Sequence, residues 1–107
     1  MAVKADEQLA ISVHAVCELL AGAELSRDPV VERARVLAFC GSVHVVSPDE
    51  RFAGRYAQLL RTVQRGGHAV GAMDLLIATA AVVDAAPLVT GNVKEFRRVP
   101  GLDLIEY

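Results

Sequence analysis

The sequence lacks the features that mark several common protein classes. Its only cysteines among 107 residues are Cys17 and Cys40, which lie far apart and form no C-x-x-C pattern. We therefore expect neither a disulfide scaffold nor a paired-cysteine metal site, and we expect two buried, reduced thiols. The longest uncharged apolar run, Leu75 to Val83, is far shorter than the ~20 residues that cross a bilayer. Because the charged start "MAVKADEQ" is also unlike a signal peptide, we expect a cytoplasmic protein without membrane contact.

Strong net charge and aromatic side chains are also scarce. The chain carries 11 basic and 13 acidic residues, a formal charge of −2, so it has no general basic character, although a local basic strip remains compatible with this balance. Hydrophobic residues make up 53% of the chain and aromatic residues only 5%. A core of alanine, valine and leucine is typical of layered α/β proteins. The length fits a single domain, residues 1–107.

Short apolar segments alternate with amphipathic ones. Strands are predicted at 9–13, 43–47, 87–90 and 102–107, and helices at 14–25, 26–41, 48–65 and 72–84, with a single helical turn after 91. Ser12 and Asp28 are predicted helix caps, and "SPDE" at 47–50 predicts a capping box for the third helix. The alternation predicts a three-layer α/β/α fold with a parallel sheet.

One carboxylate stands out. Asp74 begins a helix that is otherwise almost wholly apolar, so it is either an acid favoured by the helix dipole or a functional group at the edge of the core. Ligands bind beyond the carboxyl ends of parallel strands, and this rule brings Glu18 and Asn92 to the same edge. Taken singly, Glu18 fits a solvated helix acid, and Asn92 fits a turn residue or a helix cap.

Taken together, Glu18, Asp74 and Asn92 would form an oxygen-rich pocket. Mg²⁺ and Mn²⁺ prefer such oxygen ligands, and a cation would relieve the repulsion between the carboxylates. A metal of this kind activates water and neutralises charge on a phosphate, which suits phosphodiester hydrolysis. The spacing of His14 and Glu18 also fits a metal pair, but a surface hydrogen bond is the simpler interpretation.

A basic cluster follows Asn92. Lys94, Arg97 and Arg98 are placed to hold the phosphates of RNA beside a metal pocket. A solvated basic face is the alternative interpretation of these three residues. The sequence shows no arrangement of residues that suggests a covalent nucleophile.

Three segments resemble the PIN-domain family, and within it the VapC-type toxin ribonucleases. They are "ISVHAVCELLAGAE", "GAMDLLIATAAV" and "PLVTGNVKEFRRVPGLDLIEY", which together span residues 9–107 in the family's order. By this resemblance Glu18 and Asp74 match the family's second and third acids. Asn92 matches a residue that reaches the metal or its waters, and Thr90 matches a hydroxyl beside it. The resemblance implies Mg²⁺- or Mn²⁺-dependent cleavage of RNA, a homodimeric toxin, and a VapB-like antitoxin whose tail blocks the site.

The resemblance has one departure. Members of the family begin with a strand of the type "VLDTNV", which supplies the first acid and lies at the centre of the sheet, in the order 3-2-1-4-5. Here only "MAVKADEQ" precedes residue 9, with no strand pattern and with Asp6 and Glu7 as its acids. We therefore expect a PIN-like fold that is truncated at its N-terminus, with the central first strand missing.

Two main hypotheses follow from the resemblance and its departure. The first is a metal-dependent endoribonuclease toxin, impaired by the truncation. The second is a catalytically inactive PIN remnant that binds an antitoxin or a dimer partner. A third, a generic small α/β binding module, requires the resemblance to be accidental.

Overall fold

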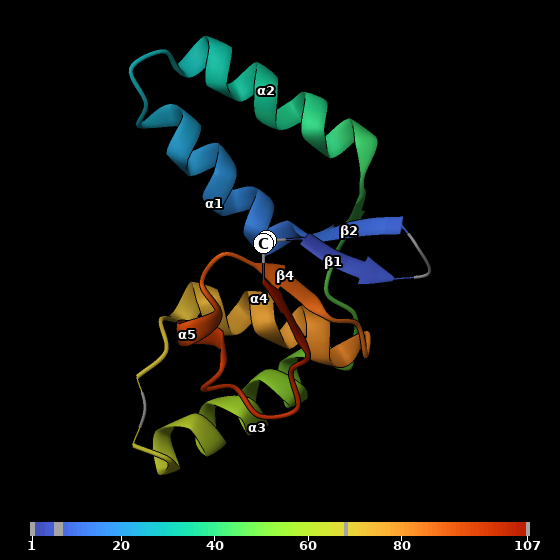
Figure 1. Ribbon diagram of the computed structural model, residues 1–107, viewed down its shortest axis with the longest axis vertical. Coiled ribbons are helices and arrows are strands. Elements are labelled where there is room, and N and C mark those ends of the chain that lie inside the picture. The colour runs from blue at the N-terminus through green and yellow to red at the C-terminus, as the bar shows by residue number, and fades with distance from the viewer. Residues whose placement is uncertain (1, 6–7, 68, 107) are drawn as a thin grey trace.

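The computed structural model describes residues 2–5, 8–67 and 69–106 (Figure 1). After the first two strands, two pairs of consecutive helices and one short helix separate the remaining strands, in the order that the sequence predicts. The elements are β1 (Ala2–Ala5), β2 (Gln8–Ser12), α1 (Val13–Glu24), α2 (Pro29–Ser42), β3 (His44–Val46), α3 (Phe52–Arg65), α4 (Ala72–Val83), β4 (Leu88–Thr90), α5 (Val93–Phe96) and β5 (Leu104–Glu106). The α/β class is confirmed.

The strands form one sheet in the order β3-β2-β1-β4-β5. The β2–β3 and β4–β5 pairs are parallel, as expected. β1 runs antiparallel to both of its neighbours, with Val3 opposite Ala10 on one side and Leu88 on the other. The expected gap at the centre is therefore closed by a segment in which the sequence showed no strand pattern. Pairing satisfies backbone groups of β2 and β4 that would otherwise face an empty position. Asp6 and Glu7 lie outside the described residues.

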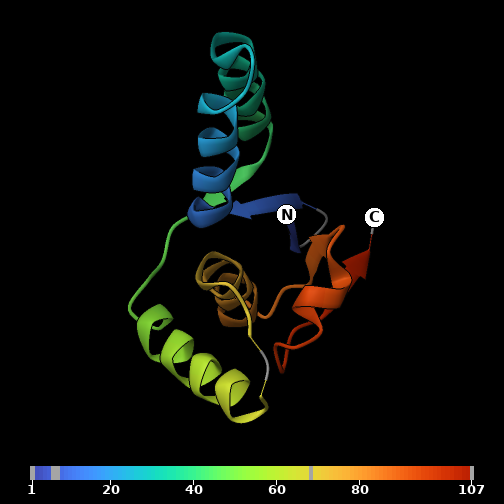
Figure 2. The ribbon, with the colours of Figure 1, turned by 90° about the vertical axis from the view of Figure 1, so that its left-hand side faces the viewer.

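The helices form two groups around the sheet. In Figure 2, α4 is seen end-on between the strands and α3, so α3 packs on the outer side of α4. The α1–α2 hairpin extends away from the sheet (Figures 1 and 2). Three layers therefore follow one another as sheet, α4 and α3, because the apolar surface of α4 is available on both sides.

The hairpin keeps most of its apolar side chains at the surface. No residue of α2 is buried, and Val30 and Leu37 are 71% and 54% exposed. The apolar stripe predicted for residues 26–41 is thus present but is not covered within this chain. The predicted caps are confirmed: Ser12 Oγ accepts the Ala15 N–H at 3.1 Å, and Asp28 Oδ1 accepts the Val31 N–H at 3.3 Å.

The third helix begins later than predicted. α3 starts at Phe52, and the capping box expected at residues 47–50 does not form. Asp49 instead accepts the backbone N–H of Arg51 at 2.8 Å, and its carbonyl accepts the Phe52 N–H at 3.1 Å. The side chain of Arg51 also binds the Asp49 carboxylate, so a tight turn replaces the first helical turn.

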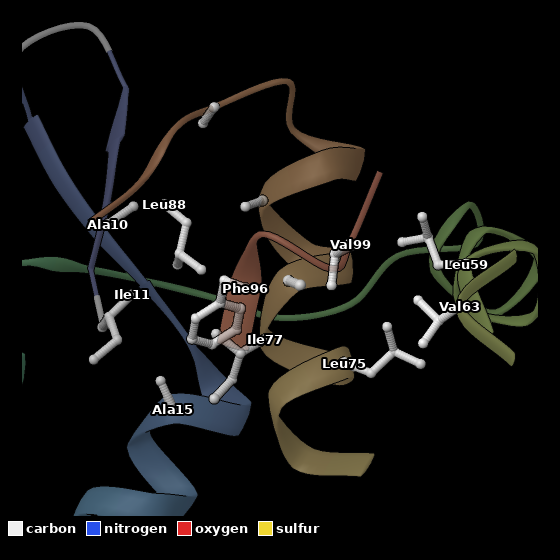
Figure 3. Packing of buried hydrophobic residues seen from close by; sticks show 13 residues of the cluster. Ala10, Ile11, Ala15, Leu59, Val63, Leu75, Ile77, Leu88, Phe96 and Val99 are labelled. Atoms are coloured by element: carbon white, nitrogen blue, oxygen red, sulfur yellow. The ribbon is translucent and has the colours of Figure 1, made fainter. Parts of the chain in front are cut away.

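The core surrounds α4 (Figure 3). Phe96 lies at its centre, with Ile11 and Leu88 of the sheet on one side and Ile77 of α4 on the other. Leu59 and Val63 bring α3 into the same cluster. Burying such a side chain stabilises the fold by about 1.5–3 kcal/mol. This packing fixes α4, and with it the position of the acid at its start.

The structure also shows the surroundings of the two cysteines and the character of the helices. Both cysteines are free, but Cys17 is exposed and Cys40 is partly exposed, so the prediction that they are buried was wrong. Each lies on the hairpin, where the helices are covered on few sides. Among the described residues, no helix is both long and apolar enough to span a membrane.

Candidate metal centre

Asp74 lies in the first turn of α4, at the edge of the core. The helix begins after Gly71, which has no side chain to cap it. A Cβ atom at Gly71 would lie 3.9 Å from Asp74 Oδ2. The carboxylate is therefore directed back towards the start of its helix. Burial raises the pKa of Asp74 above its ordinary value of 3.8, and the negative charge of Glu95 raises it further.

Glu95 is a second acid of this site that the sequence analysis did not identify. It lies on the single-turn helix α5, and its side chain is 28% exposed. Its negative charge is the second cause, after burial, of the raised pKa of Asp74. The available signal was its position one turn after Asn92, on a helix that starts at the carboxyl end of β4.

Asn92 and Thr90 form the turn between β4 and α5. Thr90 is 1% exposed, and its Oγ1 accepts the Asn92 N–H at 3.0 Å. Asn92 occupies the capping position of α5, but its side chain makes no capping hydrogen bond. The amide of Asn92 is exposed, and the hydroxyl of Thr90 holds its backbone in place.

Glu18 lies on α1, which packs on α4, and its side chain is half-buried. In Figure 2 the start of α4 faces the viewer, with α1 above it and α5 beside it. The pKa of Asp74 is raised by burial and, less strongly, by the charge of Glu95. Within residues 2–5, 8–67 and 69–106, no three His, Cys, Asp or Glu side chains gather closely enough to hold a metal. Asp74 and Glu95 are thus an acidic pair, with Glu18 on the adjacent helix.

The three basic residues of the C-terminal segment differ in their surroundings. Lys94 and Arg97 are exposed. Arg98 is partly buried, and its Nη1 donates a hydrogen bond to the Ala69 carbonyl at 3.1 Å. The same atom lies 3.9 Å from Glu95 Oε2. Only the first two are directed freely to solvent.

His14 takes part in a different feature. Its ring stacks on Phe52, with the centroids 5.2 Å apart, beside a cavity of about 40 Å³ between α1, α3 and α4. Its Nδ1 is buried and has no hydrogen-bond partner among the residues described. The surface hydrogen bond to Glu18 suggested by the spacing is not made through this atom. A cavity of this size has room for an ordered water molecule.

A second group of acids lies at the other end of α4. Arg51 Nη2 is 2.7 Å from Asp49 Oδ2 and 3.8 Å from Asp84 Oδ1, and Nη1 donates to the Val83 carbonyl at 3.5 Å. The side-chain hydrogen bond from Arg51, followed by its backbone N–H, lowers the pKa of Asp49. These acids are compensated by a cation of the protein itself.

The residues of this region carry the kinds of oxygen atom that a divalent cation binds. Asp74 and Glu95 offer carboxylate oxygens, and Asn92 offers an amide oxygen, which are the ligands that Mg²⁺ and Mn²⁺ prefer. Burial and the charge of Glu95 raise the pKa of Asp74, and a bound cation would relieve the repulsion between the two carboxylates. Mg²⁺ commonly keeps several waters and needs only one or two protein carboxylates.

The model of the PIN domain family matches residues 2–102. Ribonuclease VapC2 of Rickettsia felis is 31% identical, over 90% of this chain and 72% of its own length. The tRNA(fMet)-specific endonuclease VapC of Salmonella typhimurium is 32% identical, over 94% of this chain and 76% of its own length. VapC nucleases with this domain are in general metal-dependent.

Solved structures give the same result. VapBC2 from Rickettsia felis, bound to a DNA fragment from its promoter, has a TM-score of 0.87 at 31% identity, over 92% of this chain and 74% of the matched one. DNA-bound VapBC from Salmonella typhimurium has a TM-score of 0.86 at 33% identity, over 91% and 74%. On the family match and these relatives, the chain belongs to the PIN-domain family and is similar to its VapC ribonucleases.

Proposed function

We propose that this protein is a metal-dependent endoribonuclease of the VapC type, the toxin of a VapBC-like toxin–antitoxin pair. The observation that carries the proposal is the half-buried carboxylate of Asp74 beside that of Glu95, at the start of a helix fixed by the core. Relatives more than 30% identical are named as ribonucleases and as tRNA-specific endonucleases. RNA is therefore the proposed substrate.

Glu18, Asp74 and Asn92 are the proposed metal-binding and catalytic residues, and Glu95 joins them. The proposed cation is Mg²⁺ or Mn²⁺, which when bound would activate a water molecule and neutralise charge developing on the phosphate. Asp74 would hold the cation at the end of a rigid helix. Thr90 would keep Asn92 in place through the hydrogen bond to its backbone N–H.

The substrate would lie across the exposed basic residues beside the acids. Lys94 and Arg97 are free to contact the phosphates that flank the cleaved bond, an interaction that weakens as salt increases. Arg98 is already engaged within the protein and is a less suitable phosphate ligand. Base contacts that would select one RNA are not needed for this part of the proposal.

The proposed partners are a VapB-like antitoxin and a second copy of the chain. Leu25, Val30 and Leu37 expose apolar surface on the α1–α2 hairpin, which is suited to burial against a protein. The solved relatives are toxin–antitoxin complexes. The cytoplasm remains the proposed location, in keeping with the free thiols of Cys17 and Cys40.

One observation favours an inactive PIN domain that only binds a partner. The strand at the centre of the sheet has the sequence Ala-Val-Lys-Ala, which supplies no carboxylate. The family resemblance implies that an acid should lie on that strand. An inactive protein would retain the hairpin surface and the fold without efficient hydrolysis.

Manganese binding and RNA cleavage test the proposal together. We expect the chain to bind Mn²⁺ in calorimetric titration and to cleave transfer RNA or messenger RNA only when the metal is present. Asp74→Asn and Glu18→Gln should abolish both properties, whereas Asp84→Asn, at the far end of the same helix, should retain them. Binding without cleavage would favour the inactive alternative. Equal binding by the parent and Asp74→Asn would contradict the site itself.

A further inference from the structure

Arg98 differs from the basic residues around it because its side chain is used inside the protein. Its Nη1 donates to the carbonyl of Ala69 at 3.1 Å and lies 3.9 Å from Glu95 Oε2. Ala69 belongs to the segment that joins α3 to α4, only two residues before Gly71. One guanidinium group therefore contacts both the segment that leads to Asp74 and the acid whose charge raises the pKa of Asp74.

The segment before α4 needs such a contact. It follows Gly66 and Gly67, and Gly67 adopts a φ of 74°, a conformation that favours glycine, so the chain leaves α3 through a tight turn. α4 then begins without a capping side chain, its first turn being closed by the Leu75 N–H and the Gly71 carbonyl at 2.9 Å. A hydrogen bond that fixes Ala69 limits where this first turn, and hence Asp74, can lie.

The contact with Glu95 acts on the second acid. Arg98 lies one turn after Glu95, and its positive charge offsets part of the negative charge that Glu95 exerts on Asp74. Because Arg98 is partly buried, this pair is less screened than a fully exposed one. Nη1 makes both contacts, and the planar guanidinium holds this nitrogen in a more fixed geometry than the flexible stem of a lysine holds its ammonium.

We propose that Arg98 is a positioning residue: it holds the Ala69 carbonyl and the Glu95 carboxylate so that Asp74 and Glu95 are presented together, and it does not bind phosphate. The two contacts of Arg98 support its role in holding Ala69 and Glu95. The statement that the two acids are presented to a divalent cation rests on the proposed function.

The alternative is that Arg98 binds an RNA phosphate, as its place in a basic cluster suggests. A phosphate ligand acts only when RNA is present, and its loss reduces the salt dependence of RNA binding. A positioning residue acts on the protein without RNA. The two roles therefore differ in their effects on metal affinity and on the mobility of residues 69–73.

The experiment compares Arg98→Gln and Arg98→Lys with Arg97→Gln, a change at the neighbouring exposed arginine. We expect Arg98→Gln to weaken Mn²⁺ binding by about tenfold or more, the usual effect of losing a residue that orients metal ligands. It should also speed amide hydrogen exchange in residues 69–73. Arg98→Lys should be intermediate. Arg97→Gln should leave Mn²⁺ affinity and amide exchange unchanged. It should make the fall of log RNA affinity with log salt concentration less steep, by about one unit of slope.

Opposite results would overturn the inference. If Arg98→Gln binds Mn²⁺ and exchanges its amides as the parent does, while its salt slope falls, Arg98 is a phosphate ligand and the proposed function is unaffected. If the parent fails to bind Mn²⁺, the proposed function fails, and unchanged exchange in Arg98→Gln would separately reject the positioning role. Should the glutamine variant unfold, the same exchange and titration measurements on Arg98→Lys decide the question, with parent-like values rejecting it.

Discussion

The two ends of α4 carry acids in opposite electrostatic situations. At its C-terminal end, Asp84 and Asp49 share the guanidinium of Arg51, which lowers the pKa of Asp49. At its N-terminal end, the pKa of Asp74 is raised by burial and then by Glu95. Each end has two acids and one arginine, but Arg51 pairs with both Asp49 and Asp84, whereas Arg98 pairs with Glu95 and, among the described residues, makes no ion pair with Asp74. Asp74 is therefore the acid that is suited to a cation from outside the chain.

The helix between these ends makes the contrast possible. Leu75, Ile77, Ala78 and Ala81 are almost completely buried, so α4 is held by contacts on several sides (Figure 3). A carboxylate in the first turn of such a helix cannot move far from the charges around it. Asp74 remains where repulsion and desolvation act on it because the core, rather than its own interactions, determines its position.

The helix that joins the two ends can be loosened at Leu75. Leu75→Ala should lower the free energy of unfolding by about 2–5 kcal/mol, because a fully buried leucine leaves a cavity. Leu76→Ala is the matched control, since Leu76 is only partly buried. Urea unfolding measures both. Equal losses in the two variants would mean that the buried face does not hold the helix.

The acid pair can be broken at Glu95. Glu95→Gln should weaken Mn²⁺ binding by about tenfold, because the variant keeps the shape of the side chain but loses its charge. It should at the same time stabilise the metal-free protein at neutral pH, since a source of repulsion on Asp74 is removed. Glu106→Gln, at an exposed acid of the edge strand β5, is the control. Calorimetry and thermal unfolding with and without Mn²⁺ would contradict the pairing if both variants behaved alike.

The smallest effects, and the most direct comparison of the two ends, are in the pH dependence of stability. A raised pKa means that Asp74 favours the folded state below its ordinary value of 3.8 and loses this contribution as the pH rises through the raised value. Asp49, with its lowered pKa, contributes above 3.8 and loses its contribution as the pH falls through the lowered value. The two ends should therefore respond to pH with opposite sign.

Metal-free Asp74→Asn and Asp49→Asn, unfolded in urea from acid to neutral pH, measure these signs. Relative to the parent, Asp74→Asn should gain stability as the pH rises, and Asp49→Asn should lose it. Two curves that change in the same direction would mean that the ends of α4 are not electrostatically different. Added salt should reduce the Asp49 effect, because that carboxylate is at the surface.

Features determined by nearby residues were predictable from the sequence. The caps at Ser12 and Asp28 and the apolar helix that starts at Ala72 form as expected, since each depends on groups within one helical turn. The start of α3 was missed because Asp49 and Arg51 bind each other and displace the cap expected from Ser47. A local pattern does not show which of two local contacts is the stronger.

Features that depend on distant neighbours were harder to predict. β1 forms because β2 and β4 offer backbone partners on both sides, which the polar sequence of the segment does not reveal. Glu95 was overlooked because the acid on which its charge acts, Asp74, is on another helix, and the sequence does not show how α4 and α5 pack in the core. The roles of Glu18, Asp74 and Asn92 remain predictions that the metal titration addresses.

The central position of β1 has a practical consequence for handling the protein. An affinity tag joined before Ala2 would be attached directly to the middle strand of the sheet, where its residues compete with the pairing of Val3 to Ala10 and Leu88. β5 lies at the outer edge, so a tag placed after Glu106 would leave the inner strands undisturbed. Recombinant material for every measurement above is therefore better purified through its C-terminus.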